Sequence, residues 1–144
     1  MTDFVLDEFL PYQLAVLAER TSREFSALYR ERFGISVAEW RVLAHLSQSG
    51  TVGVREIHAR AAMDKSKVSR AAARLQAQGL IAKKTDPRDR RLVALSLTDR
   101  GRALVDQILP LARAYEAEVE ARLGPARASA LREALQALQK GGSQ

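Results

Sequence analysis

A basic helix is encoded by the run Asp64-Lys65-Ser66-Lys67-Val68-Ser69-Arg70 and the residues that follow it to Gly79. Asp64 is a favoured N-cap residue, and Gly79 is suited to ending the helix. Apolar side chains recur four and three residues apart at Val68, Ala72 and Leu75, which predicts one buried face. The opposite face carries Lys65, Ser66, Lys67, Ser69, Arg70 and Arg74. Because such side chains bind guanine edges and phosphates, the pattern indicates a DNA recognition helix, although a solvated amphipathic helix shares it.

A β-hairpin is predicted directly after this helix. Two strand-like pieces, Leu80–Lys84 and Arg91–Leu97, flank a polar, proline-containing tip. The tip holds three arginines within Pro87, Arg88, Asp89, Arg90 and Arg91. An arginine-tipped wing suits the narrow minor groove of DNA, whose negative potential attracts the guanidinium group. Asp89 is close enough in sequence to brace one of these arginines. Charged turns are common on hairpins, but a wing that directly follows a basic helix is less common.

The preceding residues supply the rest of a helix-turn-helix. A short helix is predicted over Val54–Ala62, and Met63–Asp64 forms the turn before the basic helix. Further upstream, Ser36 and Glu39 match a capping box that begins another helix, which Gly50 ends. The order of short helix, turn and basic helix therefore agrees with a DNA-binding lobe.

Long amphipathic segments flank this lobe. Residues 10–33 and 99–140 carry apolar stripes at helical spacing, and residues 51–53 form a short connector. The predicted fold is mainly α with a small β-wing: a winged helix-turn-helix over residues 36–98, flanked by N- and C-terminal helices. No repeat or linker divides the sequence, which predicts a single domain over residues 1–144.

Positive charge is concentrated in one third of the chain. The formal net charge is +6, and residues 55–102 contain 13 Lys or Arg against 5 Asp or Glu. The remaining residues contain 10 Lys or Arg against 12 Asp or Glu. Segregated positive charge is typical of nucleic-acid binding, and docking of a basic face onto anionic lipid is the weaker alternative.

The composition argues against several other classes of protein. There is no cysteine, which excludes disulfides, thiolate zinc sites and thiol-based sensing, and only His45 and His58 are available for a metal. Phosphate-loop, nucleophile-elbow and HExxH motifs are absent, so we expect neither an enzyme nor a cofactor. No apolar run approaches the roughly 20 residues of a membrane span, and no signal-peptide pattern is visible. These features predict a cytoplasmic protein without a membrane partner.

The combination of motifs resembles the MarR family of multiple-antibiotic-resistance regulators over nearly the whole chain. The resemblance rests on residues 64–70, on Leu75 with Gly79-Leu80-Ile81, and on Asp89-Arg90-Arg91 running into Leu95-Ser96-Leu97-Thr98 and Gly101. It implies an obligate homodimer of triangular outline, with residues 10–33 and 99–140 as dimerisation helices. Each lobe would serve one half-site of a pseudo-palindrome, with the recognition helices roughly 34 Å apart.

Roles for single residues follow from the same resemblance. Asp89 and Arg91 occupy the places of the family's wing signature, and Arg91 would enter the minor groove. Arg88 and Arg90 would bind there or at phosphates. Arg74 would bind a phosphate, and the other five polar residues of the basic helix would face the major groove.

The resemblance also implies a small effector, frequently phenolic or carboxylate-bearing, bound between the dimerisation helices and the DNA-binding lobe. The candidate ligand-binding residues are Tyr12, Arg20, Trp40, Arg41 and His45. Arg41 is suited to pairing with a ligand carboxylate. Each candidate has a plainer interpretation, because a tryptophan is commonly part of the core and an arginine commonly forms a surface or interface ion pair.

These inferences predict a transcriptional regulator that binds double-stranded DNA sequence-specifically as a homodimer, with an affinity that a small molecule modulates. Repression is the commoner behaviour in the family, and activation stays open. The alternative is a winged-helix protein-interaction module without specific DNA binding, against which the basic helix and arginine-rich tip argue. Steep loss of DNA affinity with rising salt would separate the two.

Overall fold

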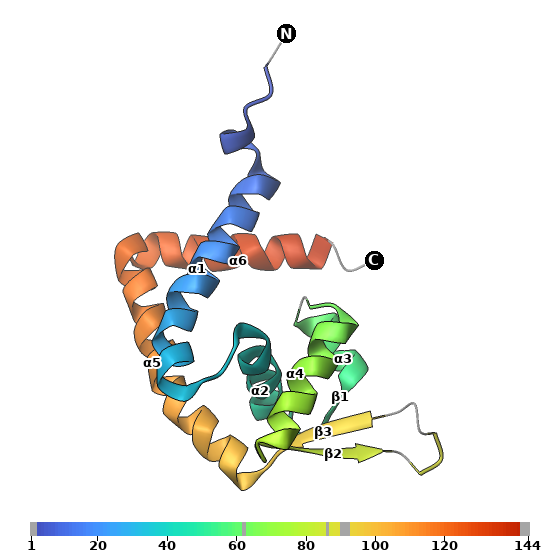
Figure 1. Ribbon diagram of the computed structural model, residues 1–144. Coiled ribbons are helices and arrows are strands. Elements are labelled where there is room, and N and C mark those ends of the chain that lie inside the picture. The colour runs from blue at the N-terminus through green and yellow to red at the C-terminus, as the bar shows by residue number, and fades with distance from the viewer. Residues whose placement is uncertain (1–2, 62, 86, 90–92, 142–144) are drawn as a thin grey trace. The chain divides into compact units, whose positions relative to one another are not determined.

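The structure, a computed structural model, describes residues 3–61, 63–85, 87–89 and 93–141 (Figure 1). Its elements are η1 (Leu6–Glu8), α1 (Leu10–Phe33), α2 (Val37–Ser49), β1 (Val52–Gly53), α3 (Val54–Arg60), α4 (Lys65–Ala77), β2 (Ile81–Thr85), β3 (Val93–Leu97), α5 (Asp99–Leu123) and α6 (Pro125–Gly141). The predicted fold class, mainly α with a small β-wing, is confirmed.

Two compact units divide the chain, Met1–Ile108 and Leu109–Gln144, and their boundary lies inside α5. The first unit holds α1 to α4, the sheet and the start of α5. The second unit holds the remainder of α5 and all of α6. A single domain over residues 1–144 stays a prediction.

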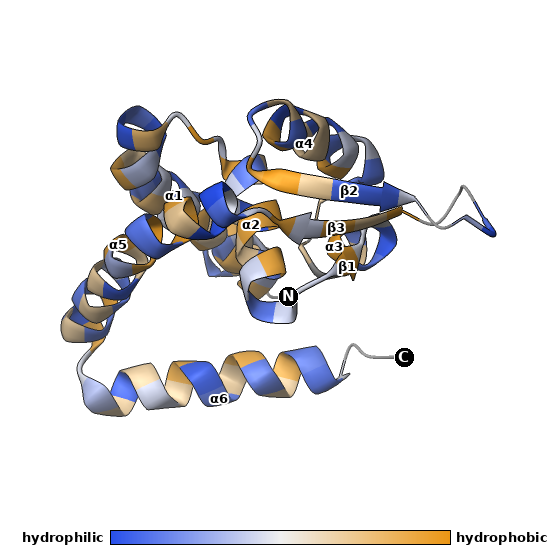
Figure 2. Ribbon diagram, turned by 90° about the horizontal axis from the view of Figure 1, so that it is seen from below, coloured by the Kyte–Doolittle hydropathy of each residue, from blue (hydrophilic) through white to orange (hydrophobic). Residues whose placement is uncertain are grey.

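The sheet has three antiparallel strands in the order β1-β3-β2. Strands β2 and β3 form the predicted hairpin, in which Ile81 lies opposite Leu97 and Thr85 opposite Val93. The expectation of a plain connector at residues 51–53 was wrong, because Val52 pairs with Leu95 of β3. A two-residue strand has no detectable alternation, and its partner lies far away in the sequence. The hairpin extends away from α2, α3 and α4 in both ribbon views (Figures 1 and 2).

The core of the first unit joins the three lobe helices to the sheet. Leu43 and Leu46 of α2, Ile57 of α3, Leu75 of α4 and Leu95 of β3 are all almost fully buried. Burial of a leucine or isoleucine side chain stabilises a fold by roughly 1.5–3 kcal/mol, so this cluster is the main support of the lobe. It holds α4 between α2 and the hairpin.

Helix α2 begins with the predicted capping box, which is confirmed. The Ser36 hydroxyl accepts a hydrogen bond from the backbone N–H of Glu39 at 3.1 Å. In return, the Glu39 carboxylate accepts from the backbone N–H of Ser36 at 2.9 Å. Two N–H groups that would otherwise lack partners at the helix start are thus satisfied.

Thr98 and Gly101 fasten the base of the hairpin to the start of α5. The Thr98 hydroxyl donates to the Gly79 carbonyl at 2.7 Å and accepts from the Gly101 N–H at 3.1 Å. The Leu80 carbonyl lies so close to Gly101 that an added Cβ would approach its oxygen to 2.0 Å. Only glycine fits this approach, which ties together the end of α4, the start of β2 and the start of α5.

In the second unit, α6 is joined to α5 by a forked ion pair. Arg132 lies 2.9 Å from the Glu120 carboxylate and 3.4 Å from that of Glu116. These contacts, Glu120 foremost, raise the pKa of Arg132. Ala128 is buried near the start of α6.

Large apolar side chains are exposed in both units. In the first unit they include Phe4, Val5, Leu6, Phe9, Leu10, Tyr12, Leu14, Val16, Leu17 and Leu28, and in the second unit Leu131, Leu135 and Leu138. Within each unit, these exposed side chains lie mainly on terminal helices, on α1 in the first unit and on α6 in the second. None of the described helices combines the length and apolarity that a membrane span requires.

Candidate nucleic-acid interface

Helix α4 begins at the predicted side-chain cap. The Asp64 carboxylate accepts hydrogen bonds from the Ser66 hydroxyl at 2.7 Å and from the backbone N–H of Lys67 at 2.8 Å. The Ser66 hydroxyl, followed by the Lys67 N–H, lowers the pKa of Asp64. Asp64 is therefore an anionic N-cap that fixes the first turn. Because Ser66 donates its one proton to Asp64, its exposed oxygen can serve a further partner only as an acceptor.

The two faces of α4 differ sharply in chemistry. Val68, Ala71, Ala72 and Leu75 are buried, and Ala71 is the one that the spacing argument did not include. All six predicted DNA-binding residues are exposed: Lys65, Ser66, Lys67, Ser69, Arg70 and Arg74. The basic and hydroxyl-bearing face is thus open to a partner, while the apolar face holds the helix in the lobe.

The turn between α3 and α4 is fixed by one side chain. The Nδ1 atom of His58 lies 2.5 Å from the Met63 carbonyl oxygen, so this nitrogen is the donor. Met63 itself is buried. Helix α3 ends at Arg60, earlier than the predicted Ala62, which lies outside the described residues. The contact from His58 holds α3 and α4 in the arrangement of a helix-turn-helix.

The hairpin carries basic side chains along β2. Lys83 and Lys84 lie opposite Leu95 and Ala94 of β3, and both lysines are exposed. Figure 2 shows β2 changing from hydrophobic at its start to hydrophilic toward the tip. At the tip, Arg88 is exposed and Asp89 is half-buried. The other predicted wing residues, Arg90 and Arg91, lie outside the described residues.

A groove of about 820 Å³ lies between α4, the start of α3 and the hairpin. Its charged lining residues are Arg55, Lys65, Lys83, Lys84 and Glu56. Ala72, Val93 and Leu95 contribute apolar lining. Among the residues that the structure describes, four cations against one acid create a positive potential, which suits a phosphate backbone running past α4.

Arg74 is bound to α2. Its Nε atom lies 3.5 Å from the second carboxylate oxygen of Glu39, the residue that also closes the α2 capping box. The Glu39 side chain is 6% exposed and that of Arg74 is 51% exposed. This ion pair therefore connects the start of α2 to the exposed face of α4.

The effector candidates on α2 lie next to an aromatic cluster. The ring of Trp40 lies 5.9 Å from that of Phe25 and 5.8 Å from that of Tyr29, measured between centroids. Burial raises the pKa of Tyr29 to about 12, and the charge of Arg41 opposes this shift. Trp40, Arg41 and His45 are all half-buried. Trp40 thus packs against Phe25 and Tyr29 while its side chain stays partly exposed.

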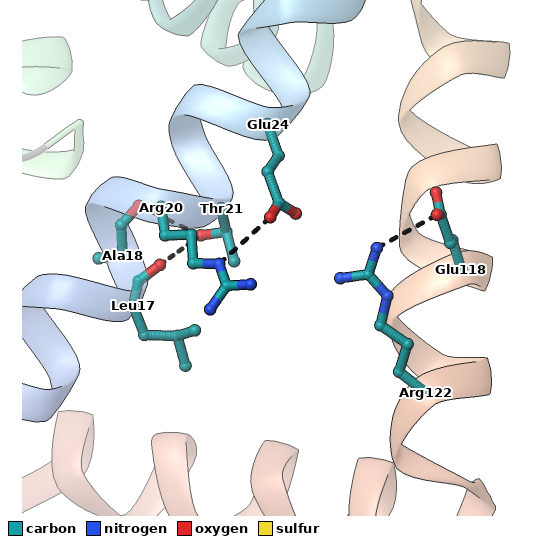
Figure 3. A network of polar contacts seen from close by, with 7 residues as sticks. All are labelled: Leu17, Ala18, Arg20, Thr21, Glu24, Glu118 and Arg122. Carbon is teal, nitrogen blue, oxygen red and sulfur yellow. Dashed lines mark hydrogen bonds and ion pairs between the residues drawn. The ribbon is translucent and has the colours of Figure 1, made fainter.

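The candidates on α1 are more exposed. Arg20 pairs with Glu24 at 3.3 Å along its own helix, next to the Thr21 hydroxyl, which donates to the Leu17 carbonyl (Figure 3). Tyr12 is 39% exposed. None of the five effector candidates lines the groove or a second cavity of about 420 Å³ beside Phe33, Leu80 and Arg100. The second unit has an ion pair like that of Arg20, between Glu118 and Arg122 at 3.2 Å (Figure 3).

The sequence argument missed three cations of the groove, Arg55, Lys83 and Lys84. The two lysines had a usable signal, because they stand at the polar end of the first predicted strand. Arg55 had none, since its place depends on how α3 packs beside the sheet. Among the described residues, no group of three or more His, Asp or Glu side chains is placed to hold a metal ion.

Comparisons of sequence place the helix-turn-helix and hairpin among known regulators. A family model described as the MarR family matches residues 33–92. The repressor MdtR of Bacillus subtilis is 38% identical over 79 residues, which is 55% of this chain. The match spans about half of that curated relative, 51% of its length.

Comparisons of structure extend the similarity to the flanking helices. A MarR family transcriptional regulator from Silicibacter pomeroyi is 30% identical, with a TM-score of 0.84, covering 96% of this chain and 98% of that one. BpsR of Bordetella bronchiseptica, whose DNA binding is regulated by 6-hydroxynicotinic acid, is 28% identical with a TM-score of 0.76. That match covers 88% of this chain and 98% of BpsR. The family model matches the helix-turn-helix, and the relative from Silicibacter pomeroyi matches nearly the whole chain in sequence and fold. The chain therefore belongs to the MarR family of winged helix-turn-helix transcriptional regulators.

Proposed function

We propose that the protein is a homodimeric transcriptional repressor that binds a pseudo-palindromic DNA operator and is released by a small molecule. The observation that carries this proposal is the exposed polar face of α4, which is held by the Asp64 cap and borders a groove lined by four cations. In this proposal Lys65, Ser66, Lys67, Ser69 and Arg70 enter the major groove. Arg74, Lys83 and Lys84 bind phosphates, and the wing arginines Arg88, Arg90 and Arg91 lie at the minor groove.

Dimerisation is supported by the exposed apolar side chains of the terminal helices. Leu14 and Leu17 on α1 and Leu131, Leu135 and Leu138 on α6 are all between 38% and 55% exposed. A second copy of the chain would bury such faces, and two-fold symmetry would present two α4 helices to two half-sites.

Repression and effector control are supported by relatives. MdtR is a repressor, and the DNA binding of BpsR responds to 6-hydroxynicotinic acid, an aromatic carboxylic acid. Here, an effector would bind near Trp40, Arg41 and His45, with Tyr12 and Arg20 as further candidates. Binding there would alter the separation of the two lobes.

The test is fluorescence anisotropy with DNA from immediately upstream of the gene and a scrambled duplex, over a series of salt concentrations. We expect preference for the native duplex and a steep, linear fall of log affinity with log salt. Substituting Lys83 and Lys84 by Gln should reduce the slope by about 3.6, since the dimer would lose four phosphate contacts that each contribute about 0.9.

A matched control removes charge far from the groove in the sequence and on another helix. Arg127→Gln on α6 is exposed and should leave the salt slope unchanged. Equal, weak binding to both duplexes would contradict sequence-specific control at this promoter. No binding at low salt would favour a winged-helix protein-interaction module instead.

A further inference from the structure

Glu39 is an acid in an unusual place. It is 4% exposed as a residue, yet it belongs to the first turn of α2. One carboxylate oxygen accepts from the Ser36 N–H at 2.9 Å. That role needs only an acceptor, and glutamine fills it in many capping boxes. The helix N-terminus favours a negative charge here, but the cap hydrogen bond does not require one, and a buried charge is costly unless it is paired.

The charge is explained by Arg74. The second carboxylate oxygen of Glu39 lies 3.5 Å from Nε of Arg74, across the packing of α2 against α4. Among the described residues, Arg74 forms its ion pair with Glu39 alone. Because the guanidinium group is planar, a contact at Nε restrains the whole fork and leaves the two terminal nitrogens for another partner.

The other cations of α4 differ from Arg74. Lys65, Lys67 and Arg70 are exposed and have no ion pair within the described part of the chain. Such side chains lose conformational entropy when they bind a phosphate. Arg74 is exposed as well, but its ion pair with Glu39 restrains it, so its ordering cost is lower.

We propose that Glu39 is a positioning residue that holds Arg74 in the orientation in which its terminal nitrogens bind a DNA phosphate. Glu39 itself does not touch DNA. The inference rests on the proposed function, and it adds a direct connection between the start of α2 and phosphate binding by α4.

The test is a double-mutant cycle on the full-length protein, with E39Q, R74Q and the double variant. DNA affinity is measured at several salt concentrations, and thermal unfolding is followed in parallel. The E39Q substitution keeps an acceptor for the Ser36 N–H while removing the charge. We expect R74Q to weaken binding about tenfold and to lower the salt slope by about 2, because the dimer would lose one phosphate contact in each protomer. E39Q should weaken binding severalfold when Arg74 is present and have no further effect in the R74Q background.

Two further variants separate positioning from stability. Ser36→Ala removes the cap hydrogen bond without touching the ion pair, so it should lower the unfolding temperature and leave the salt slope unchanged. R74K keeps the charge but lacks the planar fork, so its single ammonium group cannot hold Glu39 and a phosphate in the same fixed geometry. E39Q should therefore have less effect on DNA affinity in the R74K background than in the Arg74 background. Thermal unfolding of every variant shows whether a loss of DNA affinity comes from a loss of folded protein.

The outcomes distinguish this inference from the proposed function. If E39Q tightens binding, or changes it equally in the Arg74 and R74Q backgrounds, Glu39 acts only as a nearby negative charge and the positioning role is wrong. Specific DNA binding by the unmodified protein would then still support the proposed function. If the unmodified protein binds no DNA, both are overturned.

Discussion

Helix α4 and the first half of α1 present opposite surfaces. In α4 the apolar residues are buried and the exposed side is basic, whereas in α1 the residues Leu14, Val16 and Leu17 are exposed. A helix whose apolar face is already covered can offer only its charges to a partner. A helix whose apolar residues remain uncovered needs a partner to bury them. The two helices therefore suit two different partners, an anionic polymer for α4 and an apolar surface for α1.

The largest expected effect is on the buried face of α4. Leu75→Ala should destabilise the fold by about 2–5 kcal/mol, because it leaves a cavity in the lobe core. Lys67→Ala on the exposed face should change the free energy of unfolding by no more than about 0.5 kcal/mol. Urea unfolding of both variants measures this contrast. Similar losses for the two would mean that the faces of α4 are not segregated as described.

The next effect concerns the apolar surface of α1. Leu17→Glu should weaken self-association by roughly 2 kcal/mol or more, because it places a charge in an apolar interface. Sedimentation equilibrium at several protein concentrations measures the change in the dissociation constant of the dimer. Ala77→Glu, an equal charge change on the exposed part of α4, serves as the control and should leave the oligomeric state unchanged. A dimer that tolerates Leu17→Glu would place the interface elsewhere.

A smaller effect distinguishes the second half of α1, where Tyr29 is buried against Phe25 and Trp40. Its pKa is raised from 10.0 to about 12 by burial. The contribution of Tyr29 to the free energy of unfolding is therefore fully present below its pKa in the unfolded chain, and it falls as the pH rises from 10 toward 12. Between about pH 9 and about pH 11 the loss should be about 1 kcal/mol. The Tyr29→Phe variant should lack this loss of stability at alkaline pH. The prediction is contradicted if the free energy of unfolding depends on pH in the same way in the two proteins.

The smallest effect belongs to the cap of α4. The lowered pKa of Asp64 means that its carboxylate stabilises the fold above the ordinary value of 3.8. This contribution is lost as the pH falls below 3.8 through the folded pKa. Asp64→Asn keeps a capping oxygen without the charge, so the stability difference between the two proteins should shrink on acidification. A difference that stays constant with pH would show that the charge is unimportant.

Local signals predicted most of the fold. The cap at Asp64, the capping box at Ser36 and Glu39, and the alternation in the hairpin are encoded within a few residues, and each is present. Strand β1 was missed because its existence depends on β3, which lies far along the chain. Ala71 lies three residues after Val68 and four before Leu75, so the helical spacing was sufficient to include it in the buried face, and the prediction left it out.

In the candidate site, too, features encoded within one element were predicted and contacts between elements were not. The six residues of α4 were predicted from one helical face. The pairing of Arg74 with Glu39 could not be predicted, because it depends on how α2 packs against α4. The groove cations Arg55, Lys83 and Lys84 come from two elements that only the folded lobe brings together.

The ion pair between Glu39 and Arg74 also has a consequence for evolution. Lys65, Lys67 and Arg70 can be exchanged at little cost to stability, so a lineage can explore new operators by changing them one at a time. Arg74 cannot drift in this way, because its loss strands a buried carboxylate. Substitutions at positions 39 and 74 should therefore occur together in descendants of this protein, while the remainder of the exposed face diverges independently.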